Sequence, residues 1–205
     1  MRLKRTSDLQ DACSAISNAP AILEGKVEFL LEVSVLLVRG IDGDIRVYDV
    51  PQNTHANGIL DTSTVPAPIS QKARVRAADI ATQIAEALDY VGVLAVELFF
   101  LGEDATEPLI VNEIAPRVHN SGHWTIDACV VNQFENHIRA VAGWPLGDPQ
   151  RHSDAVMTNL IGADVNEWKN MAAEPNAGLH LYGKNEPRPG RKMGHITRIG
   201  PKSGD

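Results

Sequence analysis

Cysteine, long apolar runs and an excess of positive charge are scarce or absent in this sequence of 205 residues. The two cysteines, Cys13 and Cys129, offer neither a disulfide framework nor a metal-ligand spacing, so we expect a reducing cytoplasmic environment. No apolar run has the length that a membrane span requires, and we expect no membrane partner. The net charge of −7 does not suit a nucleic-acid surface, which needs clustered lysine and arginine.

Hydrophobic residues make up 43% of the chain, enough for a packed core. The pattern predicts an α+β fold in which a mixed or antiparallel sheet carries its helices on one side. The predicted strands cover residues 21–23, 32–39, 45–50, 93–101, 109–114, 155–161, 179–182 and 195–199. The main predicted helices cover residues 70–90, with Val75, Ile80, Ile84 and Leu88 among the apolar positions, and 131–142. Residues 51–68 show little periodicity and are predicted to form a loop.

Two glutamates lie inside apolar strands that are predicted to pair as a hairpin. If the hairpin is centred near Ala105, Glu97 and Glu113 lie opposite each other, with Cβ atoms about 4.5–5.5 Å apart. Two like charges at that distance are unfavourable without a cation, and Mg²⁺ accepts carboxylate oxygens while leaving room for phosphate oxygens. Strand alternation turns the neighbouring Asn112 to the other face unless the strand ends there. The alternative is that one glutamate faces solvent on an edge strand.

A polar loop follows the second glutamate directly. An arginine can grip a carboxylate or phosphate with two parallel hydrogen bonds, and histidines can donate, accept or shuttle protons. The alternative is a surface loop that caps the next helix, and a zinc site is disfavoured because no cysteine lies near the two histidines. The candidate residues of the loop are Arg117, His119, Asn120, Ser121, Gly122, His123 and Trp124.

Two further segments carry weaker signals for nucleotide and phosphate binding. The linker Glu24, Gly25, Lys26 and Val27 exposes backbone groups that could read an adenine edge, although an ordinary connection is the simpler interpretation. Near the carboxyl end a basic cluster suits a local phosphate. It does not suit nucleic acid, because aromatic residues are not interleaved with it. Its members are Lys184, Arg188, Arg191 and Lys192.

Several segments in colinear order resemble the 5-(carboxyamino)imidazole ribonucleotide synthases, a family of ATP-grasp ligases. They cover residues 57–63, 92–97, 111–125, 182–184 and 189–195, and the segment over 111–125 is the most specific. The resemblance implies ATP-dependent carboxylation of 5-aminoimidazole ribonucleotide with bicarbonate, through carboxyphosphate, in purine biosynthesis. Another ATP-grasp carboxylase or a formate-using ligase is an alternative, and the loop over residues 117–124 argues against it.

The resemblance also implies a role for each candidate residue. Glu24, Gly25, Lys26 and Val27 would form the adenine hinge, Glu32 would contact the ribose, and His55 would lie near the nucleotide. Glu97 and Glu113, with Asn112, would hold Mg²⁺ and the ATP phosphates. Arg117, His119, Asn120 and His123 would be catalytic, and Ser121, Gly122 and Trp124 would bind substrate. Lys184, Arg191 and Lys192 would grip the ribotide phosphate, and the family implies a homodimer.

The sequence departs from this family at its amino-terminal end. The family has an amino-terminal domain and a glycine-rich phosphate loop, and this sequence contains a counterpart of neither. We expect residues 1–30 to be the remainder of the ATP-grasp lid and hinge, residues 31–147 to be the core lobe, and residues 148–205 to be a small β-rich subdomain. Without the lid, water exclusion and phosphate clamping should fail, so the chain alone is expected to have little or no ligase activity. The alternative is a non-catalytic fragment that binds a nucleotide or docks on a partner.

Overall fold

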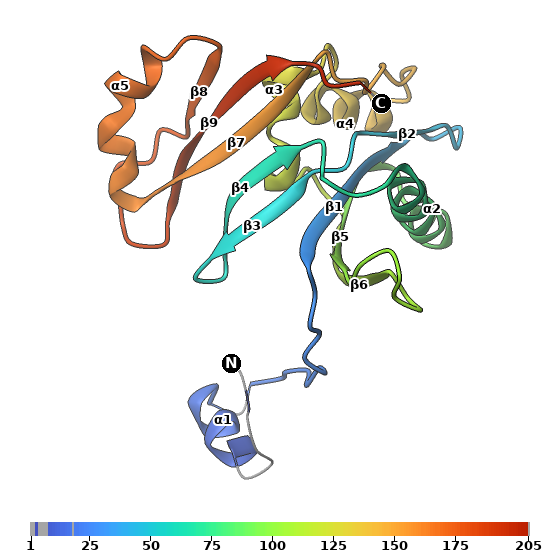
Figure 1. The fold of residues 1–205 in the computed structure, drawn as a ribbon, viewed down its shortest axis with the longest axis vertical. Coiled ribbons are helices and arrows are strands. Elements are labelled where there is room, and N and C mark those ends of the chain that lie inside the picture. The colour runs from blue at the N-terminus through green and yellow to red at the C-terminus, as the bar shows by residue number, and fades with distance from the viewer. Residues whose placement is uncertain (1–2, 4–7, 18, 205) are drawn as a thin grey trace.

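The computed structural model describes residue 3, residues 8–17 and residues 19–204, and in this part of the chain nine strands form one sheet (Figure 1). The strand order is β6-β5-β1-β3-β4-β7-β9-β8, with β2 paired to β1, and all the described pairings are antiparallel. The α+β class is therefore confirmed. The strands are β1 (Leu31–Arg39), β2 (Ile45–Val47), β3 (Gln52–Ala56), β4 (Ile59–Val65), β5 (Gly92–Phe100), β6 (Leu109–Ala115), β7 (Ser153–Ile161), β8 (Ala177–Leu181) and β9 (Lys192–Pro201).

Helices cover both faces of the sheet, because successive strand residues point to opposite sides. In β1, Val33, Val35 and Leu37 pack in one apolar cluster with α2 (Gln71–Ala87). Leu36 and Val38 pack in a second cluster with residues of α3 (Thr125–Ala128) and α4 (Gln133–Val141). The prediction that the helices lie on one side is therefore wrong. No helix in the described part of the chain is long and apolar enough to cross a membrane.

Helix α2 packs on the sheet mainly through small side chains. It begins after Ser70, whose hydroxyl accepts a hydrogen bond from the Ala73 amide. Its buried residues are Ala73, Ala77, Ala81 and Ala85, spaced four apart along one face. Val75 and Leu88, two of the predicted apolar positions, are 50% and 53% exposed, while Ile80 and Ile84 are partly buried. The alanine face allows the helix axis to lie close to β1 and β5.

The segment over residues 21–23 is not the buried strand that its composition predicts. It lies on the extended connection between α1 (Leu9–Ala15) and β1, which runs away from the sheet (Figure 1). Ile22 is 82% exposed and Leu23 is 74% exposed. Apolar composition can indicate a strand, but a strand forms only where a neighbouring strand supplies backbone hydrogen bonds.

Residues 51–68 also differ from the prediction, because they contain the hairpin of β3 and β4 rather than a loop. The turn consists of Asn57 and Gly58, which have positive φ angles of 52° and 74°. An Asn-Gly pair favours a two-residue hairpin turn, so the signal was present in the sequence. Periodicity does not indicate the strands here, because β3 is rich in polar residues and lacks the apolar alternation of a half-buried strand.

The carboxyl-terminal strands extend the same sheet. β7 pairs with β4 from Thr62↔Thr158 to Val65↔Ala155, and it pairs with β9 over most of its length. The 3₁₀ segment Gly162–Glu167 and α5 (Trp168–Ala172) connect β7 to β8. The division into a core lobe and a terminal subdomain near residue 148 stays a prediction. The hydrogen-bonded ladder, however, crosses that boundary without a break.

Candidate active site

Strands β5 and β6 place Glu97 directly opposite Glu113 in the antiparallel ladder, as the sequence predicts. A carboxylate oxygen from each glutamate and a ring nitrogen of His119 all lie within 4.8 Å of one another. The register then passes from Glu113 to Val111, so that Asn112 has no paired position and forms a β-bulge. The bulge corrects the expectation that Asn112 points to the other face, because Asn112 and Glu113 line the same cleft.

Burial and charge repulsion act together on Glu97. Desolvation is the largest cause that raises its pKa, and the negative charge of Glu113 is the second. The side chain of Glu97 is 14% exposed, whereas Glu113 is an exposed residue. A divalent cation held between the two carboxylates would relieve the repulsion and favour the charged form of Glu97. The donor set of two carboxylates therefore fits Mg²⁺, which prefers oxygen ligands.

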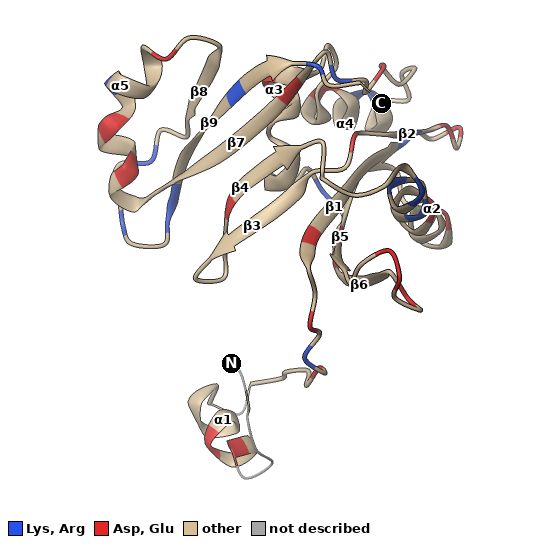
Figure 2. Cartoon of the chain, viewed as in Figure 1, with Lys and Arg blue, Asp and Glu red and all other residues tan. Residues whose placement is uncertain are grey.

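The glutamates line a cleft of about 690 Å³ whose walls come from strands far apart in the sequence. Seven of the predicted site residues line it: Glu32, His55, Glu97, Asn112, Glu113, His119 and Lys192. His55 Nδ1 contacts Glu32 Oε2 directly. Burial lowers the pKa of Lys192, and the charge of Glu97 opposes that change. Figure 2 shows basic residues where β9 begins and an acidic residue where β1 begins. The cleft takes Lys192 from β9 and Glu32 from β1, so its lining carries charges of both signs.

Buried polar groups hold the loop after β6 against the sheet. Ser34 on β1 donates to the hydroxyl of Ser121 over 2.9 Å and accepts from the Asn53 amide over 3.0 Å. Asn120 and Asn159 on β7 form a reciprocal amide pair, with N···O distances of 2.9 and 2.7 Å. The strands on either side of the loop therefore share in fixing its position. These contacts could not be predicted from sequence, because Ser34, Asn53 and Asn159 each contribute one polar side chain from a different strand.

Burial favours the neutral form of three histidines, of which His119 lines the cleft. Burial lowers the pKa of His119 and His123 to about 4, and that of His195 to about 3. His119 Nδ1 accepts the Ser121 amide hydrogen over 3.3 Å, so the neutral ring carries its proton on Nε2. That nitrogen lies 3.6 Å from Glu97 Oε1. His119 therefore presents an uncharged hydrogen-bond donor toward the carboxylate pair.

His195 and its neighbours form a group that the sequence did not reveal. The His195 ring stacks on His180 with centroids 4.6 Å apart and lies 5.0 Å from the ring of His123. Its Nδ1 atom is 2.9 Å from the Tyr182 hydroxyl, and His180 Nε2 is 2.9 Å from an Asp127 oxygen. His180 and His195 are directly paired positions of β8 and β9. This pairing could be recognised only once the register of the terminal strands was known.

The predicted hinge and phosphate-binding residues lie outside the lining of the cleft, apart from Lys192. Residues 24–27 are on the extended connection before β1, where Val27 is half-buried and the other three are exposed. Lys184 is exposed and donates to the Lys192 carbonyl over 2.6 Å. Arg191 donates to the Glu186 carbonyl, and Arg117 donates to the Val118 carbonyl. The roles of these residues stay predictions.

Trp124 and Gly122 are packing residues in this structure. Trp124 is 0% exposed and belongs to the apolar cluster between the sheet and α4, which leaves no side-chain surface for the predicted contact with substrate. A Cβ atom on Gly122 would lie 2.5 Å from a methyl group of Leu36 and 3.1 Å from the amide of Gln133. The absence of a side chain at Gly122 therefore lets the loop lie close to the sheet and to α4. The sequence suggests a different reason for a glycine here, namely close approach of the backbone to a ligand.

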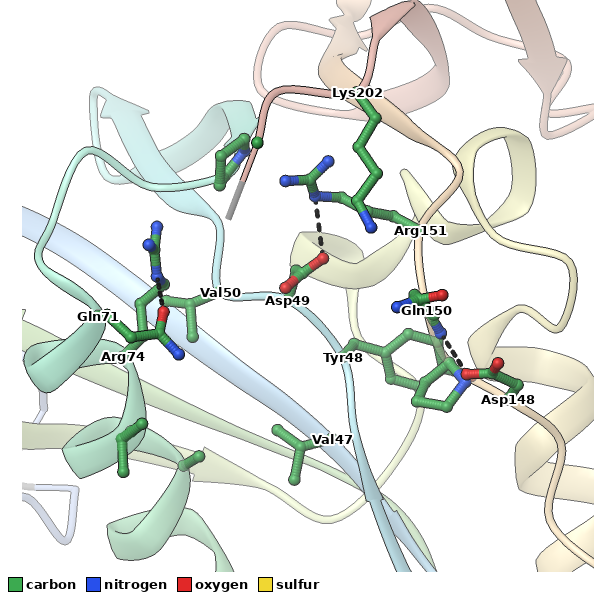
Figure 3. Close-up of a pocket in the computed structure, with 15 residues that line it drawn as sticks. Val47, Tyr48, Asp49, Val50, Gln71, Arg74, Asp148, Gln150, Arg151 and Lys202 are labelled. Atoms are coloured by element: carbon green, nitrogen blue, oxygen red, sulfur yellow. Dashed lines mark hydrogen bonds and ion pairs between the residues drawn. The ribbon is translucent and has the colours of Figure 1, made fainter.

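A second cavity, of about 490 Å³, lies between the start of α2, the residues after β2 and residues 148–151 (Figure 3). None of the predicted site residues is among the described residues that line it. Arg151 is 3% exposed, and its guanidinium lies 2.9 Å from Asp49 and 2.6 Å from Asp154. The buried charge of Arg151 is thus already paired within the protein.

Comparison with known families identifies most of this architecture. The model described as the ATP-grasp domain matches residues 1–134. The chain belongs to the ATP-grasp family. A second model, described as the phosphoribosylaminoimidazole carboxylase C-terminal domain, matches residues 155–205 of this ATP-grasp chain. The cleft described above takes residues from both matched segments, since Glu97 belongs to the first and Lys192 to the second.

Individual relatives agree with the resemblance that the sequence indicated. The N5-carboxyaminoimidazole ribonucleotide synthase of Brucella melitensis is 56% identical over 94% of this chain and 52% of its own length. A solved N5-carboxyaminoimidazole ribonucleotide synthetase from Thermus thermophilus has a TM-score of 0.86 and 46% identity, covering 95% of this chain and 53% of its own.

A structure of the Aspergillus clavatus synthase, in complex with ADP and 5-aminoimidazole ribonucleotide, has a TM-score of 0.91 and 32% identity, covering 98% of this chain and 55% of its own. The resemblance is therefore confirmed. The ATP-grasp chain described here spans about half the length of the curated relatives it matches.

Proposed function

We propose that this chain supplies the Mg²⁺-nucleotide site and part of the ribonucleotide site of an ATP-dependent ligase. The ligase would carboxylate 5-aminoimidazole ribonucleotide with bicarbonate in the cytoplasm. One observation carries the proposal: Glu97 and Glu113 are paired on a cleft that also contains His119 and Lys192. The relatives support the choice of substrates, since the Aspergillus clavatus protein is described as a complex with ADP and 5-aminoimidazole ribonucleotide.

In this reaction ATP would phosphorylate bicarbonate, and the exocyclic amine would then attack the carboxyl carbon of carboxyphosphate and release phosphate. Such chemistry depends on positive charge around phosphate oxygens more than on a protein nucleophile. Glu97 and Glu113 would hold Mg²⁺, with Asn112 beside them. The bound ion would neutralise phosphate oxygens. Lys192 would add a positive charge from the opposite wall, and it lines the same cleft as the glutamates.

The polar loop would orient the two small substrates. His119 offers a neutral Nε2–H donor next to Glu97, and an uncharged donor can bind a bicarbonate oxygen without competing with Mg²⁺ for the carboxylates. Arg117 is exposed at the start of the loop and would bind a carboxylate or phosphate. Asn120, Ser121 and His123 would complete this wall of the site.

The remaining roles follow the family resemblance. Residues 24–27 would bind the adenine edge, and Glu32, which contacts His55 in this structure, would bind the ribose. Lys184, Arg191 and Lys192 would bind the ribotide phosphate. Because the chain spans about half the length of its relatives, the complete reaction is proposed for the ligase as a whole, in which the family implies a homodimer.

Calorimetric titration of the purified chain with ADP and Mg²⁺ tests the nucleotide site. We expect Glu97→Gln and Glu113→Gln each to weaken Mg²⁺-dependent binding by about tenfold or more, equivalent to about 1.4 kcal/mol. Glu107→Gln is the matched control, because Glu107 is an exposed carboxylate in the connection between β5 and β6. Equal Mg²⁺-dependent affinity in all four proteins would exclude the paired glutamates as the metal site.

A further inference from the structure

Gln133, the first residue of α4, is fully buried, and its side chain makes three hydrogen-bond contacts with the loop. Its side-chain oxygen accepts the His119 amide hydrogen over 2.8 Å. Its side-chain nitrogen donates to the His119 carbonyl over 2.8 Å and lies 2.9 Å from His123 Nδ1. The Gln133 backbone amide donates to Thr125 Oγ1 over 3.1 Å, which anchors the start of α4 to the first residue of α3, directly after the loop.

These contacts determine which way the Gln133 amide points. The His119 N–H needs an acceptor and the His119 carbonyl needs a donor, so exchanging the amide oxygen and nitrogen would break both bonds. The amide nitrogen has two hydrogens, of which one goes to the His119 carbonyl and the other faces His123 Nδ1. His123 Nδ1 must therefore accept a hydrogen bond, and in the neutral ring the proton lies on Nε2.

The surroundings of His123 hold the ring in this state. Its ring centroid lies 5.4 Å from that of Phe134, 6.3 Å from that of Tyr182 and 5.0 Å from that of His195, so aromatic rings limit its rotation. Burial lowers the pKa of His123 to about 4, and the charges of His119, Lys192 and His180 act in the same direction, whereas a hydrogen bond to the His119 backbone acts against them with a smaller effect. A charged ring would in addition place an Nδ1–H against the N–H of Gln133.

We propose that Gln133 is a positioning residue that fixes His123 as the Nε2–H tautomer and thereby makes it a neutral hydrogen-bond donor for an oxyanion of the substrate. The tautomer follows from contacts within the chain. The choice of a carboxylate or phosphate oxygen as the acceptor rests on the proposed function. Gln133 itself is wholly enclosed and would not touch the substrate.

Long-range ¹H–¹⁵N NMR of the ¹⁵N-labelled chain at neutral pH tests the proposal, with the His123 signals assigned by their loss in His123→Gln. We expect an unprotonated Nδ1 and a protonated Nε2 in the unmodified chain. In Gln133→Glu the carboxylate can only accept, so we expect the proton to move to Nδ1 or the ring to become charged. Gln83→Glu makes the same change at an exposed position of α2 and should leave His123 unaltered.

Two outcomes would overturn the proposal. One is an Nδ1-protonated His123 in the unmodified chain, which requires no variant to fold. The other is an unchanged tautomer in Gln133→Glu when near-ultraviolet circular dichroism shows native packing. Titration with 5-aminoimidazole ribonucleotide provides a separate result. If the tautomer is as proposed but the ribonucleotide does not bind, the positioning role stands and the proposed function fails.

Discussion

Replacing Glu97 with glutamine measures the strain in the carboxylate pair. The facing oxygens of Glu97 and Glu113 lie within 4.8 Å of each other. Two unit charges at that separation repel by about 1 kcal/mol at the dielectric constant of water and by about 3 kcal/mol at an effective value of 20. Because Glu113 is exposed, solvent screens the pair and the lower part of this range applies. We expect Glu97→Gln to raise the free energy of unfolding by about 1 to 2 kcal/mol in the absence of cations.

A cation should offset this advantage of the variant. A ligand at about 100 times its dissociation constant stabilises the folded state by about 2.7 kcal/mol, whereas a site that binds about tenfold more weakly gains about 1.4 kcal/mol from the same concentration of Mg²⁺ with ADP. Urea denaturation followed by circular dichroism, in chelator and in Mg²⁺ with ADP, would give both values. Glu107→Gln controls for the change in net charge. A Glu97→Gln protein that is less stable than the unmodified chain in chelator would refute the reasoning.

The same variant has a predicted pH signature. Burial and Glu113 raise the pKa of Glu97 in the folded state, so the folded protein holds this proton more tightly than the unfolded chain does. Stability from this group is therefore lost as pH rises above the ordinary carboxyl range and through the raised pKa. We expect Glu97→Gln to remove that loss in metal-free buffer, which denaturation midpoints across pH 4 to about 7 would show.

Three further predictions concern the rest of the fold. Burial raises the pKa of Cys129 to about 12, so mass spectrometry after alkylation at neutral pH should find Cys129 unmodified in the native chain and modified after unfolding. Ala81→Leu should destabilise the chain by about 1 to 3 kcal/mol, because the larger side chain overpacks the contact between α2 and the sheet. Val75→Leu, on the exposed side of α2, should change the stability by less than about 0.5 kcal/mol. Equal denaturation midpoints for the two variants would contradict the assigned helix face. The lowered pKa values of the three buried histidines mean that the unfolded chain binds protons more readily, so stability should fall as pH drops from about 6.5 toward 4. A flat pH profile in the Glu97→Gln background would contradict this assignment.

The sequence was informative where a pattern is local. The apolar strands around Glu97 and Glu113 have a single short connection, so the pairing of these two glutamates could be inferred and is confirmed, although a bulge shifts the pairing from Leu98 onward. The Asn57-Gly58 turn is equally local, but the polar strands beside it lack the apolar alternation that predicts a strand. Residues 21–23 are the opposite case, because a strand is predicted there and none is present. An apolar segment does not reveal whether a neighbouring strand is available to pair with it.

Long-range contacts account for what could not be predicted at the site. Gln133 meets His119 and His123 only after α4 folds back on the loop, and Asn159 meets Asn120 across 39 positions of sequence. The side to which Asn112 points depends on a bulge, which a single inserted residue creates without an evident sequence signal. Trp124 resembled an exposed site residue because its neighbours are polar, yet it is enclosed by the second apolar cluster.

The continuous ladder from β6 to β8 has a mechanical consequence for the ligand cleft. Glu97 and Lys192 belong to strands of one sheet, which are linked through the pairings of β1, β3, β4 and β7. A movement that brought these two residues closer together would have to distort that pairing. The ladder therefore helps to set the spacing between the acidic and the basic wall when the protein folds.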